Sequence, residues 1–207
     1  MARPKSATHD LKRDQILDTA AQCFARQSFP VATMNDIATA CGTSKARLYH
    51  YYQSKDAILF DVLDRYTQKL LAIIGQVQAT AQPRNLDDRA ALHELIRAFL
   101  HEYQTSAERH VSLLHDTKFL SAEVDARLRE SPRELILNRQ RDVVAAVTRA
   151  LRRAYPGRLD AQNQTAVTMM LFGMINWTFT WLRPGGRLSY DDFAEDVIAF
   201  LERGLGQ

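Results

Sequence analysis

The chain is poor in the residues that mark several protein classes. Only two of its 207 residues are cysteines, Cys23 and Cys41. They lack CxxC spacing and fall on apolar helix faces, so we expect two buried thiols in a reducing compartment rather than a disulfide framework. Glycine and proline number only eight and six. Most of them lie near predicted helix ends, which favours a mostly helical chain.

Long apolar runs are also lacking. None approaches the ~20 residues that a membrane-spanning helix requires. Residues 1–14 are polar and charged, without the apolar segment of a secretory signal. We therefore expect a cytoplasmic protein with no membrane partner. Hydrophobic residues make up 46% and charged residues 25%, as in an ordinary globular protein.

Catalytic and metal-binding motifs are missing. The sequence contains no GxSxG, no phosphate-binding P-loop and no GxGxxG, so we predict that the chain is not an enzyme. His101, His110 and His115 do not form HExxH and no cysteine joins them. We accordingly predict no metal site and no resident cofactor.

Charge is unevenly spread along the chain. Residues 1–55 carry eight basic and four acidic side chains, a net charge of +4, which leaves −1 for the remainder of the total of +3. A basic N-terminal quarter on a near-neutral body is typical of a protein that touches phosphates with one end. This excess of positive charge is small and indicates nucleic-acid binding only when a motif supports it.

That motif spans Thr33 to Lys55 and predicts two short helices joined by a tight turn. Thr33 or Asn35 can cap the first helix and Thr43 or Ser44 the second, because each offers a short side-chain oxygen. Gly42 falls where the chain must reverse, and glycine tolerates the positive φ of such a turn.

The second of these helices has an apolar anchor and a polar surface. Leu48 and Tyr52, four residues apart, are suited to packing inward. The other faces carry cationic and hydrogen-bonding side chains, namely Lys45, Arg47, Tyr49, His50 and Tyr51. A short helix of this kind can enter a DNA major groove. The alternative is an ordinary helical corner with a solvated face.

The rest of the chain predicts further helices, so we expect an all-α fold of about nine helices. The first helix runs from about 9 to 27, and a long helix from Ser54 to about Ala81. An apolar helix is predicted over Ala161 to Leu182 and a final one from Tyr190 or Asp191 to about Arg203.

Several motifs between Ile16 and Leu59 together resemble the DNA-binding domain of TetR-family repressors. They are I-L-x-x-A-x-x-x-F, D-I-A, C-G-T-S, L-Y-x-Y-Y and S-K-D-A-I-L, in the family's order. The resemblance implies a helix-turn-helix DNA-binding domain over residues 1–53 and a ligand-binding and dimerisation domain over residues 54–207. It further implies a homodimer on a palindromic operator, with the two C-terminal helices and their copies forming a four-helix bundle.

The resemblance also implies individual roles in contacting double-stranded DNA. Thr33 and Lys55 would meet phosphates, Tyr49 and Tyr51 the DNA backbone, and His50 a base or a phosphate. Facing the groove or its walls would be Thr43, Ser44, Lys45 and Arg47, while Ala46 would touch a thymine methyl. The sequence departs from the family at Tyr51, where histidine is frequent, and at Tyr52, where phenylalanine is usual.

A second resemblance concerns the effector. The stretch from Phe172 to Ser189 is similar to the C-terminal region of a TetR subgroup that responds to acyl-CoA thioesters of fatty-acid, sterol or aromatic-acid catabolism. Trp177 and Trp181 continue a stripe from Met170 and Met174, which would line a pocket or instead belong to the core or dimer seam. The other candidate ligand-binding residues are Asn176, Arg183, Arg139 and Arg141, whose guanidinium groups would pair with CoA phosphates.

Two alternatives stay open at this point. One is a repressor of an efflux or stress gene that answers a lipophilic, drug-like molecule. The other is a ligand-carrying helical protein whose N-terminal domain no longer binds DNA.

Overall fold

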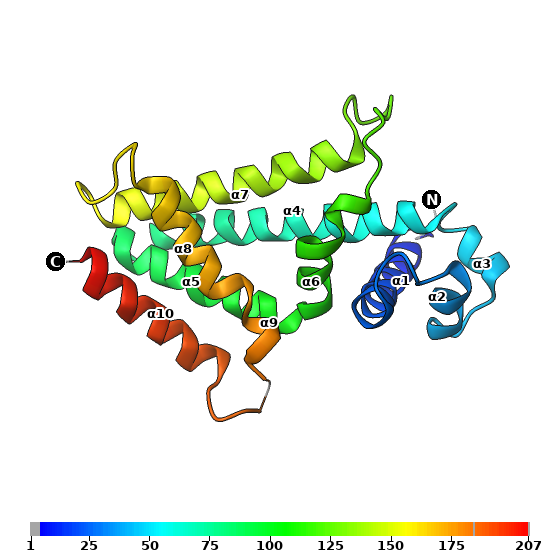
Figure 1. Cartoon of the computed structure of the whole chain (residues 1–207), viewed down its shortest axis with the longest axis horizontal. Coiled ribbons are helices and arrows are strands. Elements are labelled where there is room, and N and C mark those ends of the chain that lie inside the picture. The colour runs from blue at the N-terminus through cyan, green and yellow to red at the C-terminus, as the bar shows by residue number, and fades with distance from the viewer. Residues whose placement is uncertain (1–4, 184, 207) are drawn as a thin grey trace. The chain divides into compact units, whose positions relative to one another are not determined.

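The structure, a computed structural model, describes residues 5–183 and 185–206, which form ten α-helices and one short 3-10 helix (Figure 1). The N-terminal helices are α1 (Lys5–Gln27), α2 (Met34–Ala40), α3 (Lys45–Tyr49) and α4 (Lys55–Ala81). Then follow α5 (Asp88–Thr105), α6 (Ala107–Asp116), η1 (Thr117–Phe119), α7 (Pro132–Ala154), α8 (Gln164–Asn176), α9 (Thr178–Trp181) and α10 (Tyr190–Leu205). The predicted all-α class is confirmed, and in these ranges the only β pairing is the isolated bridge between Asp125 and Glu130.

One predicted helix is interrupted. The apolar segment from Ala161 to Leu182 forms α8 and α9, separated at Trp177, whose φ is −96° and ψ is 11°. The hydroxyl of Thr178 donates to the Ile175 carbonyl at 3.1 Å, and that of Thr180 to the Trp177 carbonyl at 2.7 Å. Such bonds give backbone carbonyls an alternative to the helical ladder. The prediction of a single helix here is wrong.

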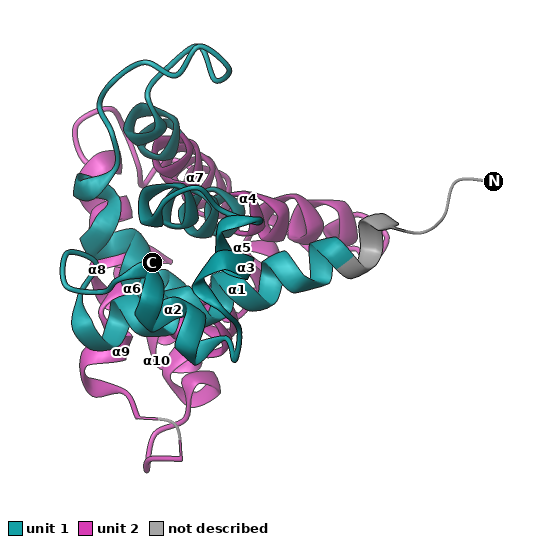
Figure 2. Ribbon diagram, turned by 90° about the vertical axis from the view of Figure 1, so that its right-hand side faces the viewer, with its two compact units in different colours: residues 1–67, 108–138 teal, residues 68–107, 139–207 magenta. Residues whose placement is uncertain are grey.

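The chain packs as two compact units (Figure 2). The first contains residues up to 67 and residues 108–138, and the second contains residues 68–107 and 139–207. Helices α4 and α7 each contribute to both units. By packing, residues 54–67 and 108–138 group with the N-terminal helices, whereas the division into a DNA-binding and a ligand-binding domain after residue 53 stays a prediction.

The first unit has its core where α1 and α2 meet. Side chains from four helices are buried there: Ile16, Leu17 and Phe24 of α1, Ile37 of α2, Leu48 of α3, and Leu59 and Leu63 of α4. Phe29 lies edge-on to Phe24, with ring centroids 5.2 Å apart, and stacks on Phe119 at 5.5 Å. These ring contacts join α1, the loop after it and η1.

Tyr52, just beyond α3, is 4% exposed and lies in a polar network. Its hydroxyl donates to Asp61 Oδ2 at 2.8 Å and accepts from Arg13 Nε at 3.2 Å. Arg13 also pairs with Asp61, and its guanidinium lies 5.1 Å from the Tyr52 ring centroid. Burial raises the pKa of the Tyr52 hydroxyl to about 12. The tyrosine that replaces the usual phenylalanine therefore buries its hydroxyl with both hydrogen-bonding functions used.

The second unit is centred on α5, which packs along α10. Leu92, Ile96 and Phe99 of α5 are buried, as are Val197 and Leu201 of α10. The edge of this contact is polar, because Arg97 donates two hydrogen bonds to Glu195 at 2.6 and 3.1 Å. α10 is thus held against α5 by both apolar and ionic contacts.

We predict that Tyr52→Phe lowers the free energy of unfolding by about 1 kcal/mol. The substitution removes one buried hydroxyl and leaves the Arg13–Asp61 pair able to form, and a typical buried hydrogen bond contributes about this amount. Urea denaturation followed by circular dichroism measures the change. Tyr49→Phe, at a 44% exposed position, is the matched control and should change stability by less than about 0.5 kcal/mol. Equal effects of the two variants would contradict a stabilising role for the network.

Candidate DNA-binding site

The two helices of the predicted motif are capped by their own sequence. At the start of α2, the Thr33 hydroxyl accepts from the Asp36 backbone N–H at 3.2 Å, and the Asp36 carboxylate accepts from the Thr33 N–H at 2.9 Å. At the start of α3, the Ser44 hydroxyl accepts from the Arg47 N–H at 3.2 Å. Of the alternatives left by the sequence, Thr33 and Ser44 are the caps. Gly42 has φ +61° in the turn between them, as expected.

Helix α3 presents to solvent the face that the sequence predicts. Leu48 is completely buried beneath it, as predicted. Thr43 and Tyr51 are half-buried, and the exposed side chains are Ser44, Lys45, Ala46, Arg47, Tyr49 and His50. The exposed face of this short helix therefore carries hydrogen-bond donors and cations above its buried anchor. The individual DNA contacts stay predictions.

Two aromatic contacts involve side chains on or next to this exposed face. The Lys45 ammonium lies 5.9 Å from the centroid of the Tyr49 ring. His9 of α1 stacks on Tyr51 with centroids 5.0 Å apart. His9 is a neighbour of the predicted reading surface that the sequence did not indicate, because it is 42 positions away from Tyr51 along the chain.

In the structure, the Lys55 side chain contacts backbone carbonyls of the loop before α2. Its ammonium donates to the backbone carbonyls of Phe29 and Ala32, both at 2.7 Å, and to that of Pro30 at 3.2 Å. It also lies 4.4 Å from the Phe29 ring centroid. An ammonium has three donors, and all three hold the loop between α1 and α2. Lys55 therefore stabilises this loop in the structure, and its contact with a phosphate stays a prediction.

The Thr33 hydroxyl is also hydrogen-bonded within the chain. Its hydroxyl hydrogen points to Asp36 Oδ2 at 2.7 Å, while its oxygen caps the helix. The hydroxyl hydrogen bond from Thr33 is the main reason that the pKa of the Asp36 carboxyl is lowered. A hydroxyl has one hydrogen, which points to Asp36 here, and the donation from Thr33 to a phosphate stays a prediction.

The candidate ligand-binding residues do not gather inside one unit's core. Met170 is 66%, Trp177 47% and Trp181 49% exposed, while Met174 and Asn176 are half-buried. Trp177, between α8 and α9, and Trp181, at the end of α9, are therefore about half exposed, and their roles in a ligand pocket or a dimer seam stay predictions.

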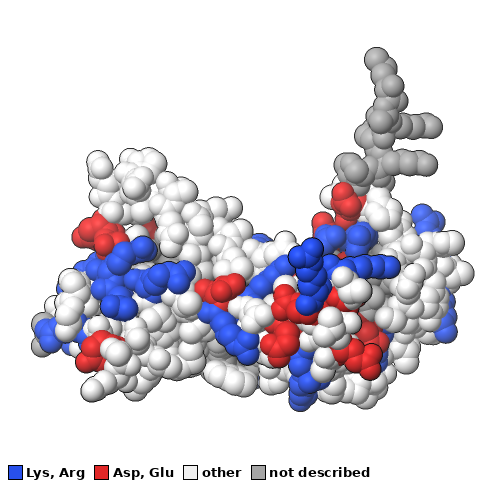
Figure 3. All heavy atoms as spheres, turned by 90° about the horizontal axis from the view of Figure 1, so that it is seen from above, with Lys and Arg blue, Asp and Glu red and all other residues white. Residues whose placement is uncertain are grey.

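Two of the arginines predicted to pair with CoA phosphates lie on α7 and the third follows α9. Arg139 is half-buried and Arg141 exposed on α7, and Arg183 is exposed after α9. On the face drawn in Figure 3, basic and acidic side chains are interleaved. Basic charge alone therefore does not mark a mouth for an anionic ligand on this face.

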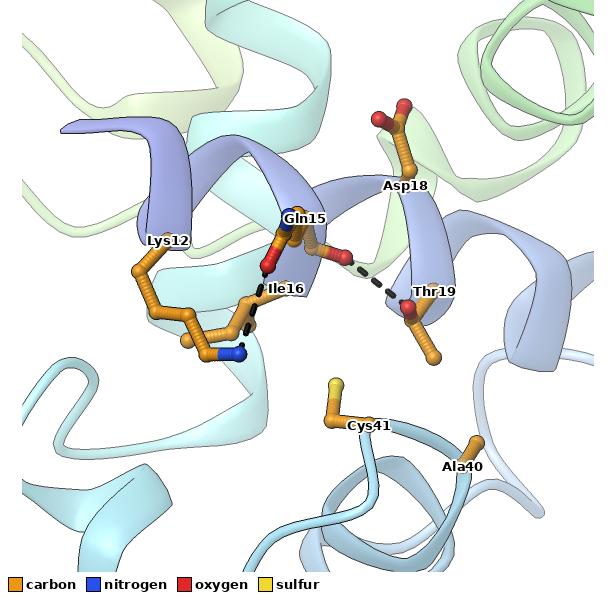
Figure 4. A pocket seen from close by; sticks show the side chains of 7 residues that line it. All are labelled: Lys12, Gln15, Ile16, Asp18, Thr19, Ala40 and Cys41. Carbon is orange, nitrogen blue, oxygen red and sulfur yellow. Dashed lines mark hydrogen bonds between the residues drawn. The ribbon is translucent and has the colours of Figure 1, made fainter. Parts of the chain in front are cut away.

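A cavity of about 290 Å³ lies between α1 and the end of α2 (Figure 4). Lys12, Gln15, Thr19 and Cys41 contribute its polar wall. Cys23 is buried as predicted, but Cys41 is only half-buried because it lies at the end of α2 and borders this cavity. Burial raises the pKa of both thiols, so neither has the lowered pKa of a reactive cysteine.

Within residues 5–183 and 185–206, no helix is both long and apolar enough to span a bilayer. In the same ranges, no three His, Cys, Asp or Glu side chains are placed to hold a metal ion.

Fold and site together define a helix-turn-helix regulator, and comparison with known proteins identifies its family. Residues 16–62 match the family described as bacterial regulatory proteins, tetR family. Residues 85–205 match the tetracyclin repressor-like C-terminal domain. The chain belongs to the TetR family of transcriptional regulators, whose members are DNA-binding proteins and not enzymes.

Solved structures and curated relatives agree with this assignment. A TetR-family transcriptional regulator from Bordetella parapertussis is 34% identical, with 91% of this chain and 92% of that one covered and a TM-score of 0.81. AibR, solved with isovaleryl coenzyme A and operator DNA, is 24% identical over 91% of this chain and 97% of its own, with a TM-score of 0.75. The transcriptional repressor KstR2 of Rhodococcus jostii is 22% identical, covering 94% of this chain and 91% of the relative.

We predict that Lys45→Ala and Lys55→Ala separate DNA contact from fold stability. Lys45→Ala removes an exposed cation and should lower the slope of log affinity against log salt by ~1 without changing stability. Lys55→Ala leaves three carbonyls without their donor and should destabilise the chain by about 1–3 kcal/mol, with an unchanged salt slope in the folded fraction. Fluorescence anisotropy at several salt concentrations and urea denaturation give the two quantities. A reduced slope with wild-type stability for Lys55→Ala would support its phosphate role.

Proposed function

We propose that this regulator is a repressor that binds a palindromic operator as a homodimer and leaves it when a small effector binds. The observation that carries the proposal is the exposed face of α3, with its cations and hydrogen-bond donors above the buried Leu48. Such a helix is shaped to enter a major groove. Most contacts would go to phosphates, with Ser44, Lys45, Arg47, Tyr49 and Tyr51 as the residues proposed for them.

The homodimer would form through α8 and α10. Met170 and Phe200 are 66% and 65% exposed, and Met169 is 44% exposed. Large apolar side chains gathered on a surface mark sites of association. Pairing these helices with their copies would bury this surface and set the spacing of two reading helices, which a palindrome requires.

The proposed effector is an acyl-CoA thioester. Two observations support it: the resemblance of Phe172–Ser189 to the acyl-CoA-responsive subgroup, and the fold shared with AibR, which was solved with isovaleryl coenzyme A. Release from DNA requires that the ligand bind one dimer shape more tightly than the other. Trp177, Trp181, Arg139, Arg141 and Arg183 remain candidates for contact with it. A lipophilic, drug-like effector is the alternative.

We predict salt-sensitive binding to a palindrome upstream of the chain's own gene, which a gel shift would detect. Isovaleryl-CoA or octanoyl-CoA should then release the protein, whereas free octanoate should not. Release by rhodamine 6G alone would favour the drug-responsive alternative. The absence of salt-sensitive binding to any palindrome in that region would count against the repressor itself.

Dimerisation through α8 and α10 predicts the effect of Met170→Glu. A charge in the seam should shift the protein from dimer to monomer in sedimentation velocity, because an unpaired charge is costly to bury. Val124→Glu is the matched control, since Val124 is 73% exposed in the segment between η1 and α7, and it should stay dimeric. A dimeric Met170→Glu protein would place the seam elsewhere.

A further inference from the structure

Glu102 of α5 is a buried carboxylate with only half of its acceptors used. Its side chain is 5% exposed. Oε2 lies 2.7 Å from the Lys69 ammonium on α4, and the Lys69 side chain is itself 52% exposed. Oε1 is buried and receives no hydrogen bond from any residue in the described part of the chain. The two oxygens thus differ, because one meets a cation at the surface and the other is buried without a donor.

This arrangement is costly for a residue that serves stability alone. A buried polar atom without a hydrogen bond costs roughly 1–3 kcal/mol, and more when the group is charged. Tyr103, next in sequence, is 2% exposed and stacks on Phe99 with centroids 5.9 Å apart. Burial, with a smaller contribution from Glu102, raises the pKa of Tyr103. Unsatisfied buried acceptors in native proteins call for a specific explanation.

We propose that Glu102 Oε1 is the polar anchor of the effector site and accepts a hydrogen bond from an N–H or O–H group on the buried part of the effector. The inference rests on the proposed effector response. Glu102 lies within residues 85–205, the part of the chain that matches the tetracyclin repressor-like C-terminal domain. Lys69 orients the carboxylate through Oε2 and leaves Oε1 for the ligand.

The proposal restricts the chemistry of the effector. A hydrocarbon, an ether or a simple ester offers no hydrogen to Oε1, so it would leave the acceptor unsatisfied. A site that expects a hydrogen bond discriminates strongly against analogues that lack the donor. A CoA thioester meets the requirement through the amide N–H and hydroxyl groups of its pantetheine arm. The effector class is thus a molecule with an N–H or O–H donor in its buried part.

The experiment compares matched probes that differ in one donor. The pairs are 4-propylphenol with 4-propylanisole, and cyclohexanol with methoxycyclohexane, with affinities measured by calorimetry on the full chain. In the wild-type protein the hydroxyl member should bind roughly tenfold more tightly, as expected for a hydrogen bond to a charged group. In Glu102→Leu this preference should disappear, while Glu102→Gln, which keeps an acceptor oxygen, should retain most of it.

Lys69→Met is the control that separates ligand recognition from a structural ion pair. It removes the partner of Oε2 and keeps Oε1, so the donor preference should persist. Glu102→Leu leaves only an exposed lysine without its partner and should therefore fold, which circular dichroism checks. A preference that survives in Glu102→Leu overturns the proposal. So does its absence from the wild-type chain, whether both members of a pair bind equally or neither binds.

The test also separates this proposal from the acyl-CoA effector. If isovaleryl-CoA and octanoyl-CoA fail to release the wild-type protein from DNA, the acyl-CoA assignment fails, and the probe pairs still decide the role of Glu102. If the thioesters release the wild-type protein, Glu102→Leu should need roughly tenfold more of either one, with its operator affinity unchanged. Equal potency of the thioesters on the wild-type protein and on Glu102→Leu would overturn the role proposed for Glu102.

Discussion

The hydrogen-bonded group formed by Arg13, Tyr52 and Asp61 is the constraint on which the position of α3 depends. It joins α1, the end of α3 and α4 through one buried hydroxyl that both accepts and donates. Helix α3 has only five residues, too few to be stable by itself, since isolated helices of this length do not persist in water. Its orientation is therefore determined by Leu48 and Tyr52 at its base. The exposed side chains of α3 can accordingly be substituted without loss of the fold.

Two polar side chains beside α2 and α3 stabilise the fold in this structure. The Lys55 ammonium closes the loop after α1 with three carbonyls, and the Thr33 hydroxyl completes the cap of α2. Both residues have the chemistry of a phosphate contact, and both have their donors occupied. Lys45 and Arg47 stand on the exposed face instead, so the proposed affinity for DNA rests on fewer cations than the local sequence contains.

The second unit carries exposed apolar side chains and one buried carboxylate. Met170, Trp177, Trp181 and Phe200 are exposed and suit association with a second copy. Glu102 is buried and suits recognition of a donor within the chain. The proposed seam and the proposed effector anchor therefore involve different residues, so that Met170→Glu and Glu102→Leu test the two roles independently.

The sequence by itself determined the helical class, the capped turn at Gly42, the inward position of Leu48 and Tyr52, and the family. These follow from local periodicity, capping chemistry and ordered motifs, all of which act within a few residues. Only the tertiary structure decided that Lys55 binds carbonyls at Phe29 and Ala32, that His9 stacks on Tyr51, that the helix predicted over 161–182 breaks at Trp177, and that Glu102 meets Lys69. Three of these depend on residues more than 20 positions apart, and the break at Trp177 is a local backbone feature that hydrophobic periodicity does not register.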